Sequence, residues 1–142
     1  MASELKVNTL TGVSTAGSIA VTAEGNSTTT NLQGGLCKAW IIYNKTDDSI
    51  TDSLNVSGDP DNAGGDQTIS YTNNMATAKG YHAHGTHAHT SDVTTNAFSH
   101  QPKEDDSLAT SSVRMVAIFT NPTTSGISDR VFNSTIIVGD LA

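Results

Sequence analysis

The chain has 142 residues, enough for one domain with a modest core and too few for a large enzyme scaffold. Its formal net charge of −7 argues against nucleic acid as a partner, because phosphates require basic patches. No apolar run approaches the roughly 18 residues of a membrane span and the opening residues lack the order of a signal peptide, so we expect no membrane insertion and synthesis in a cytoplasm.

Ser and Thr make up about a quarter of the residues, whereas helix formers such as Leu, Lys, Arg, Glu and Gln are few. A high β-branched content is typical of short strands joined by polar turns. We therefore predict an all-β fold, as a small antiparallel sandwich or a jelly-roll-like domain.

The first part of the chain, residues 1–35, is rich in Ser, Thr and Gly and carries only short alternating apolar pieces. Such a stretch buries little surface by itself, so we predict an extended N-terminal arm that orders against a partner. Gly34 and Gly35 mark the boundary, and residues 36–142 are predicted to form the β-domain.

Apolar or alternating segments in the β-domain predict the core strands, which are residues 36–43, 49–57, 67–72, 113–120 and 130–138. The core candidates are large apolar residues of these strands: Trp40, Ile41, Ile42, Val116, Ile118, Ile136 and Val138. Between the second and third strands, residues 58–66 are almost all turn formers and predict a hairpin turn. A calcium loop is disfavoured there, because Ala63 and Ser70 occupy the positions where an EF-hand needs ligands.

Residues 76–110 have little apolar content, and we predict that they form a long projecting loop inserted into the β-domain. Loops of this length in a compact domain are usually functional or ordered by another molecule.

This segment contains the motif GYHAHGTHAH, at residues 80–89, which is two successive Gly-x-His-x-His units and holds four of the five histidines. Imidazoles at positions i and i+2 of an extended strand project to the same face, so each unit presents a pair of nitrogen ligands. A closed zinc site needs about four ligands and an octahedral metal needs six. The spacing therefore predicts metal sites completed by three chains on a threefold axis, with His82, His84, His87 and His89 as ligands.

Other interpretations of these histidines remain open. They could lie in an exposed polar loop and only titrate near neutral pH, or hold a metal within one chain. The two pairs are offset by five residues, so in a straight strand His87 and His89 would face away from His82 and His84 unless Gly85 bends the chain. His100 stands apart, and we expect it to be a loop residue.

Residues 38–71 resemble a module of tail-fibre and other structural proteins of tailed phages, especially marine ones. In that module an Ala-Trp strand is followed by an Asp-Ser-x-Asn-Val-Ser strand, an Asp/Asn/Gly turn and a short alternating strand. The opening SELKVNTL and the closing SDRVFNSTIIVGD are similar to the ends of such proteins. The resemblance implies a virion surface protein made in the host cytoplasm, with the N-terminal arm contacting other capsid or tail proteins and a host surface receptor as a further partner.

The Gly-x-His-x-His units resemble those in the receptor-binding tip of T-even long tail fibres, where three intertwined chains surround iron ions held by six histidine nitrogens each. The resemblance implies Fe(II) or another octahedral transition metal at a trimer axis, with His82 and His84 forming one ring and His87 and His89 the next.

Taken together, these features favour a non-catalytic virion surface protein, a homotrimeric short fibre or spike or a capsid decoration protein, with metal held between chains. The alternative is a free-standing metal-binding or carbohydrate-binding β-domain. An enzyme is disfavoured, because the chain has no P-loop, no dinucleotide-binding glycine pattern and no convincing catalytic triad.

Overall fold

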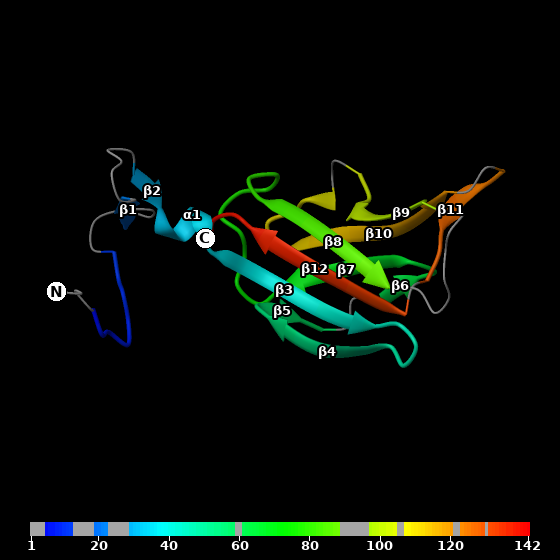
Figure 1. Ribbon diagram of the computed structural model, residues 1–142, viewed down its shortest axis with the longest axis horizontal. Coiled ribbons are helices and arrows are strands. Elements are labelled where there is room, and N and C mark those ends of the chain that lie inside the picture. The colour runs from blue at the N-terminus through cyan, green and yellow to red at the C-terminus, as the bar shows by residue number, and fades with distance from the viewer. Residues whose placement is uncertain are drawn as a thin grey trace. The chain divides into compact units, whose positions relative to one another are not determined.

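In the computed structural model the chain divides into two units, Met1–Leu36 and Cys37–Ala142 (Figure 1). The division lies one residue after the expected boundary of the arm. The residues described are 5–12, 19–22, 29–58, 61–88, 97–104, 107–120, 123–129 and 131–142.

The first unit contains the antiparallel hairpin of β1 (Ala20–Thr22) and β2 (Thr29–Asn31), followed by the one-turn helix α1 (Leu32–Gly35). The side chain of Asn31 accepts a hydrogen bond from the backbone N–H of Gly34 (3.1 Å) within that turn. None of the described residues of this unit is buried. A two-stranded hairpin without a buried face is marginally stable in water, so the described part of this unit has little burial to hold it.

The second unit is a ten-stranded antiparallel sheet. Its strands are β3 (Cys37–Asn44), β4 (Ser49–Leu54), β5 (Val56–Ser57), β6 (Asp61–Ala63), β7 (Asp66–Tyr71), β8 (His82–Ala88), β9 (Ala97–Pro102), β10 (Ser112–Thr120), β11 (Ser125–Ile127) and β12 (Phe132–Val138). The strand order is β4-β3-β12-β8-β9-β10-β7-β5, with β6 paired to β7 and β11 to β10. The prediction of an all-β antiparallel fold is confirmed.

The sheet folds over into a nearly closed sandwich because its two edge strands are neighbours in the chain. β4 lies at one end of the strand order and β5 at the other, yet Asn55 alone connects them. Asn55 adopts a left-handed conformation (φ 56°), and its side-chain amide donates to the carbonyl groups of Lys38 (3.1 Å) and Asn73 (3.0 Å). Figure 1 shows the resulting front layer, β4-β3-β12-β8, with the remaining strands behind it.

The core lies between these layers and follows the alternation of the strands. It consists mainly of Ala39, Ile41, Tyr43, Ile69, Tyr71, Met75, Tyr81, Ala83, Val113, Met115 and Ile137. Among the predicted core residues, Ile41 and Val116 are buried, whereas Trp40, Ile42, Ile118 and Val138 are only partly buried. Ile136 is 47% exposed and its neighbour Ile137 is fully buried, because successive residues of β12 point to opposite faces of the sheet.

The predicted projecting loop over residues 76–110 must be corrected, because it contains two strands of the sheet. β8 pairs with β12 over seven successive residues, and β9 pairs with β10 over six. The inward positions of β8 include the small residues Ala83 and Gly85. The strand therefore forms without large apolar residues, whose absence had led to the prediction of a loop.

Candidate metal-binding and contact face

The histidine-rich strand β8 alternates cleanly between the two sides of the sheet. His82 and His84 are exposed, whereas Ala83 and Gly85 between and after them are buried. The rings of His82 and His84 lie side by side, with centroids 6.3 Å apart and planes at 10° to each other. The predicted pairing of these two imidazoles on one face is confirmed.

The neighbouring strands place apolar side chains beside this pair. Ile136 of β12 lies opposite His84, Trp40 of β3 lies opposite Ile136, and Leu54 of β4 lies opposite Trp40. Leu54 and Ile136 are about half exposed, and Phe132 further along β12 is 40% exposed. We call the exposed side of β4-β3-β12-β8, with His82 and His84 at its margin, the outer face. Contiguous exposed apolar side chains of this kind mark interaction sites.

The outer pair supplies two donors of a coordination sphere. Within the described ranges, no three His, Cys, Asp or Glu side chains lie close enough to hold one metal ion. A complete sphere at His82 and His84 therefore needs donors of another kind or from another molecule, such as a second copy of the chain.

The second predicted pair is placed differently. His87 turns to the inner side of the sheet and is half-buried, and His89 lies outside the described residues. β8 keeps its pairing with β12 through Gly85, which lies opposite Thr135. Gly85 therefore does not turn the strand over, and His87 does not share the outer face with His82 and His84.

His100 is the residue that sequence reasoning missed. It lies on β9, is 4% exposed, and packs its ring beneath β8, so that a Cβ added at Gly85 would overlap it. Burial lowers the pKa of His100 to about 4, although backbone groups of Thr86 and Ser134 favour the protonated imidazole. His100 is therefore neutral at pH 7. No pattern around it in the sequence indicates a partner, because the residue that accommodates it is a glycine on another strand.

Polar residues surround His100 inside the sandwich. On the inward side of β12, Asn133 lies opposite His87 and Thr135 lies opposite Gly85. The rings of His87 and His100 meet edge to face with centroids 6.4 Å apart. We call His87, His100, Asn133 and Thr135 the inner polar cluster.

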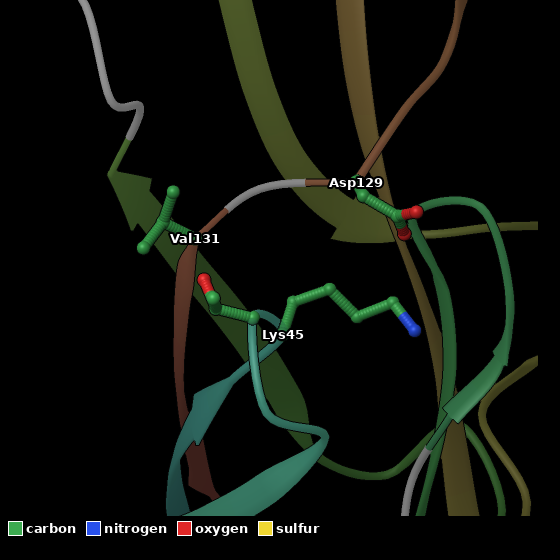
Figure 2. A pocket seen from close by; sticks show the side chains of 4 residues that line it. Lys45, Asp129 and Val131 are labelled. Carbon is green, nitrogen blue, oxygen red and sulfur yellow. The ribbon is translucent and has the colours of Figure 1, made fainter.

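A separate pocket at one end of the sandwich is lined by Lys45, Thr46, Asp129 and Val131. Figure 2 shows Lys45 extended along one side of it, with Asp129 and Val131 on the other. Its volume of about 190 Å³ is below the roughly 300 to 1,000 Å³ of small-molecule sites. Moreover, the Lys45 ammonium pairs with Asp61 (2.7 Å) and Asp48 (2.9 Å), so its charge is already neutralised.

The ion pair between Lys45 and Asp61 of β6 connects the front layer to the back layer, whereas Asp48 lies in the same turn as Lys45. Burial alone would lower the pKa of Lys45, but hydrogen bonds to Asp48 and Asp61 raise it above its usual value. Asp129 accepts a hydrogen bond from the N–H of Gly65 (2.6 Å). Gly65 has a φ of 79°, and a side chain there would overlap the backbone of Ser128. The residues around the pocket therefore hold neighbouring segments of the fold together.

A second ion-pair network is centred on Asp66 of β7. Arg114 of β10 donates two hydrogen bonds to its carboxylate (2.8 Å each), and Lys103 donates a third (2.9 Å). These hydrogen bonds, above all those from Arg114, hold the pKa of Asp66 well below its usual range. The segment predicted as a hairpin turn, residues 58–66, contains the strand β6, which forms a tight hairpin with β7. Its carboxylates are used in ion pairs, Asp61 with Lys45 and Asp66 with Arg114.

The described part of the chain contains no helix long and apolar enough to span a membrane. No protein-family model matches the chain, and comparisons with curated proteins and with solved structures give no significant match.

Proposed function

We propose that the chain is a non-catalytic structural protein of a phage virion surface. In this proposal it assembles as a homotrimer through the outer face, as a short fibre or spike or as a capsid decoration protein. His82 and His84 of three chains then hold one octahedral transition metal, such as Fe(II). The observation that carries the proposal is the pair of parallel imidazoles on one exposed strand face, next to exposed apolar side chains.

The geometry of the outer pair is compatible with binding one metal. With metal–nitrogen bonds of about 2.1 Å, two imidazoles on adjacent positions of an octahedron have ring centroids about 4.5 to 5 Å apart. The observed 6.3 Å must therefore close by about 1.5 Å, which rotations of exposed side chains permit. Three chains, each contributing two nitrogens, would complete the octahedron.

Self-association also accounts for the apolar side chains of the outer face. Removing Ile136, Trp40 and Leu54 from water stabilises a complex through the hydrophobic effect. Around a threefold axis every copy contributes the same residues, so the outer faces of three chains can meet at one place. Because Ile136 is in register with His84, a contact that buries the apolar row also brings the imidazoles of different chains together.

The position in a virion rests on the resemblance of residues 38–71 to phage structural modules. The N-terminal unit fits a role in attachment to a neighbouring capsid or tail protein, because Leu5, Val7 and Leu10 are exposed and gain burial only against another surface. Immunogold labelling of particles with an antibody against the β-domain would place the protein on the head or the tail. Particles that carry no label would contradict a virion role.

Oligomeric state and metal content test the assembly. We expect light scattering after gel filtration to give a trimer with one metal per three chains, and a chelator to weaken it. The double variant His82→Ala/His84→Ala should lose the metal and most of the trimer. Thr86→Ala, on the same exposed face of β8, is the matched control and should behave as wild type. A monomer with one metal per chain would contradict the proposal and favour a free-standing metal-binding or carbohydrate-binding domain.

A further inference from the structure

We propose that the inner polar cluster is a second metal site, contained within one chain. His100 and His87 would supply two nitrogen ligands, and Asn133 and Thr135 two oxygen ligands, to a divalent transition ion of the zinc or cobalt class. This site is separate from the outer pair and does not depend on association between chains.

The register of three strands brings the four side chains together. Asn133 and Thr135 occupy successive inward positions of β12, directly opposite His87 and Gly85 of β8. His100 of β9 lies opposite Gly85 from the other side. Directly opposed residues of antiparallel strands have Cβ atoms about 4.5 to 5.5 Å apart, so Asn133 and His87 are close neighbours. Thr135 and His100 flank Gly85 on its two sides.

Several polar atoms of the cluster are buried and have no well-aligned hydrogen-bond partner within the described part of the chain. They are both ring nitrogens of His100, Oδ1 of Asn133 and Oγ1 of Thr135. Each of these three residues is at least nine-tenths buried. Buried polar atoms are almost always satisfied by protein, water or an ion, because leaving them unsatisfied destabilises the fold. Several such atoms close together point to a metal ion, which can be coordinated by several nitrogen and oxygen atoms at once.

The two histidine rings lie near the spacing that a shared metal ion requires. Two imidazoles on a tetrahedral ion have ring centroids about 5.3 Å apart for metal–nitrogen bonds of about 2.1 Å. The observed 6.4 Å between His87 and His100 needs a closure of about 1 Å.

Gly85 holds the principal ligand in place. The His100 ring occupies the space that a side chain at Gly85 would fill, so its position is fixed by packing before any metal binds. Ligands whose side chains are locked by their surroundings lose little freedom on binding. With neutral donors only, and without the thiolates of structural zinc sites, we expect micromolar affinity.

The test uses the full chain with the outer pair removed, as His82→Ala/His84→Ala, treated with EDTA and then titrated with Zn²⁺ and with Co²⁺. We expect one equivalent bound per chain, a Co²⁺ visible spectrum, and shifts of the His87 and His100 side-chain resonances in ¹H–¹⁵N spectra. Adding His100→Gln should weaken binding by at least about tenfold. Binding that is unchanged by His100→Gln, or the absence of any bound metal, would overturn the proposal and leave ordered water as the partner of the cluster.

Because His100→Gln could lose binding simply by misfolding, a second variant and a second measurement test the site independently. Thr135→Val keeps the shape of the side chain and removes one donor, so it should weaken Zn²⁺ binding while the fold is retained. The ¹H–¹⁵N spectra of the wild-type imidazoles need no variant, and resonances of His87 and His100 that do not respond to Zn²⁺ would overturn the proposal. The two metal sites are told apart by stoichiometry, because the outer pair takes one metal per three chains and the inner cluster one per chain.

Discussion

Among the described residues, Gly85 and His100 form the one pair in register between β8 and β9. The glycine leaves a gap on the inner side of β8, and the imidazole from the next strand fills it. The two layers of the sandwich are therefore connected at this place by the packing of a ring against backbone, and not by a long ladder of hydrogen bonds.

Gly85→Ala should destabilise the β-domain, because the added methyl group overlaps the His100 ring. Overpacking of an interior costs about 1–3 kcal/mol, measured as a decrease in the free energy of unfolding in urea. The matched control is Gly64→Ala, since a Cβ at Gly64 meets nothing within 4 Å, and it should be close to neutral. Equal stability of the two variants would mean that the His100 ring does not pack beneath Gly85.

The stability of the metal-free protein should depend on pH through His100. Its pKa is about 4 in the folded chain against 6.5 as a reference, so between these values the unfolded state binds more protons. Stability is therefore fully present above about pH 6.5 and decreases as the pH falls toward 4, by about 3 kcal/mol in total. Urea unfolding at pH 7, 5.5 and 4.5 measures this slope. His100→Gln should flatten the slope over this window, and a slope that stays the same would assign it to other groups.

The sequence predicts the all-β class and the sheet face of the outer pair, because both depend on local composition and on alternation. The same alternation places His87 on the opposite side from His84, as the odd spacing between them requires. That residues 82–88 form a strand inside the sheet could not be predicted from their own amino-acid composition. Ala83 and Gly85 give almost no hydrophobic signal, and the reason that a glycine suits this strand is the His100 ring on β9.

The sequence also does not show which of two consecutive apolar residues in a strand points into the core. Ile41 and Ile42, or Ile136 and Ile137, are consecutive β-branched residues, and a shift of register by one residue exchanges which of them is buried. The register becomes known only when the partner strands are known. The pairing of Ile136 with Trp40 and His84 puts that isoleucine on the outer face, where sequence reasoning had placed it in the core.

Asp66→Asn should destabilise the β-domain, because it removes the negative charge that pairs with Arg114 and Lys103. The carboxylate is mostly buried while Arg114 is partly exposed, so we expect a loss of about 1–3 kcal/mol in the free energy of unfolding. Asp48→Asn is the comparison, since Asp48 pairs with Lys45 at an exposed position and such pairs contribute little. Equal effects of the two substitutions would contradict a structural role for the Asp66 network.

Ile136 and Ile137 allow association and folding to be separated with two adjacent substitutions. Ile137 is fully buried in the core, so Ile137→Ala should lower the free energy of unfolding by about 2–4 kcal/mol through the cavity it creates. Ile136→Ser removes an exposed apolar side chain from the outer face and should change the stability of the isolated chain by less than about 1 kcal/mol. It should, however, shift the assembly toward monomer in light scattering, because the same residue lies beside His84 in the proposed contact. A stable trimer of Ile136→Ser would show that the chains associate through another surface, and the metal stoichiometry of that trimer would then show whether His82 and His84 still meet.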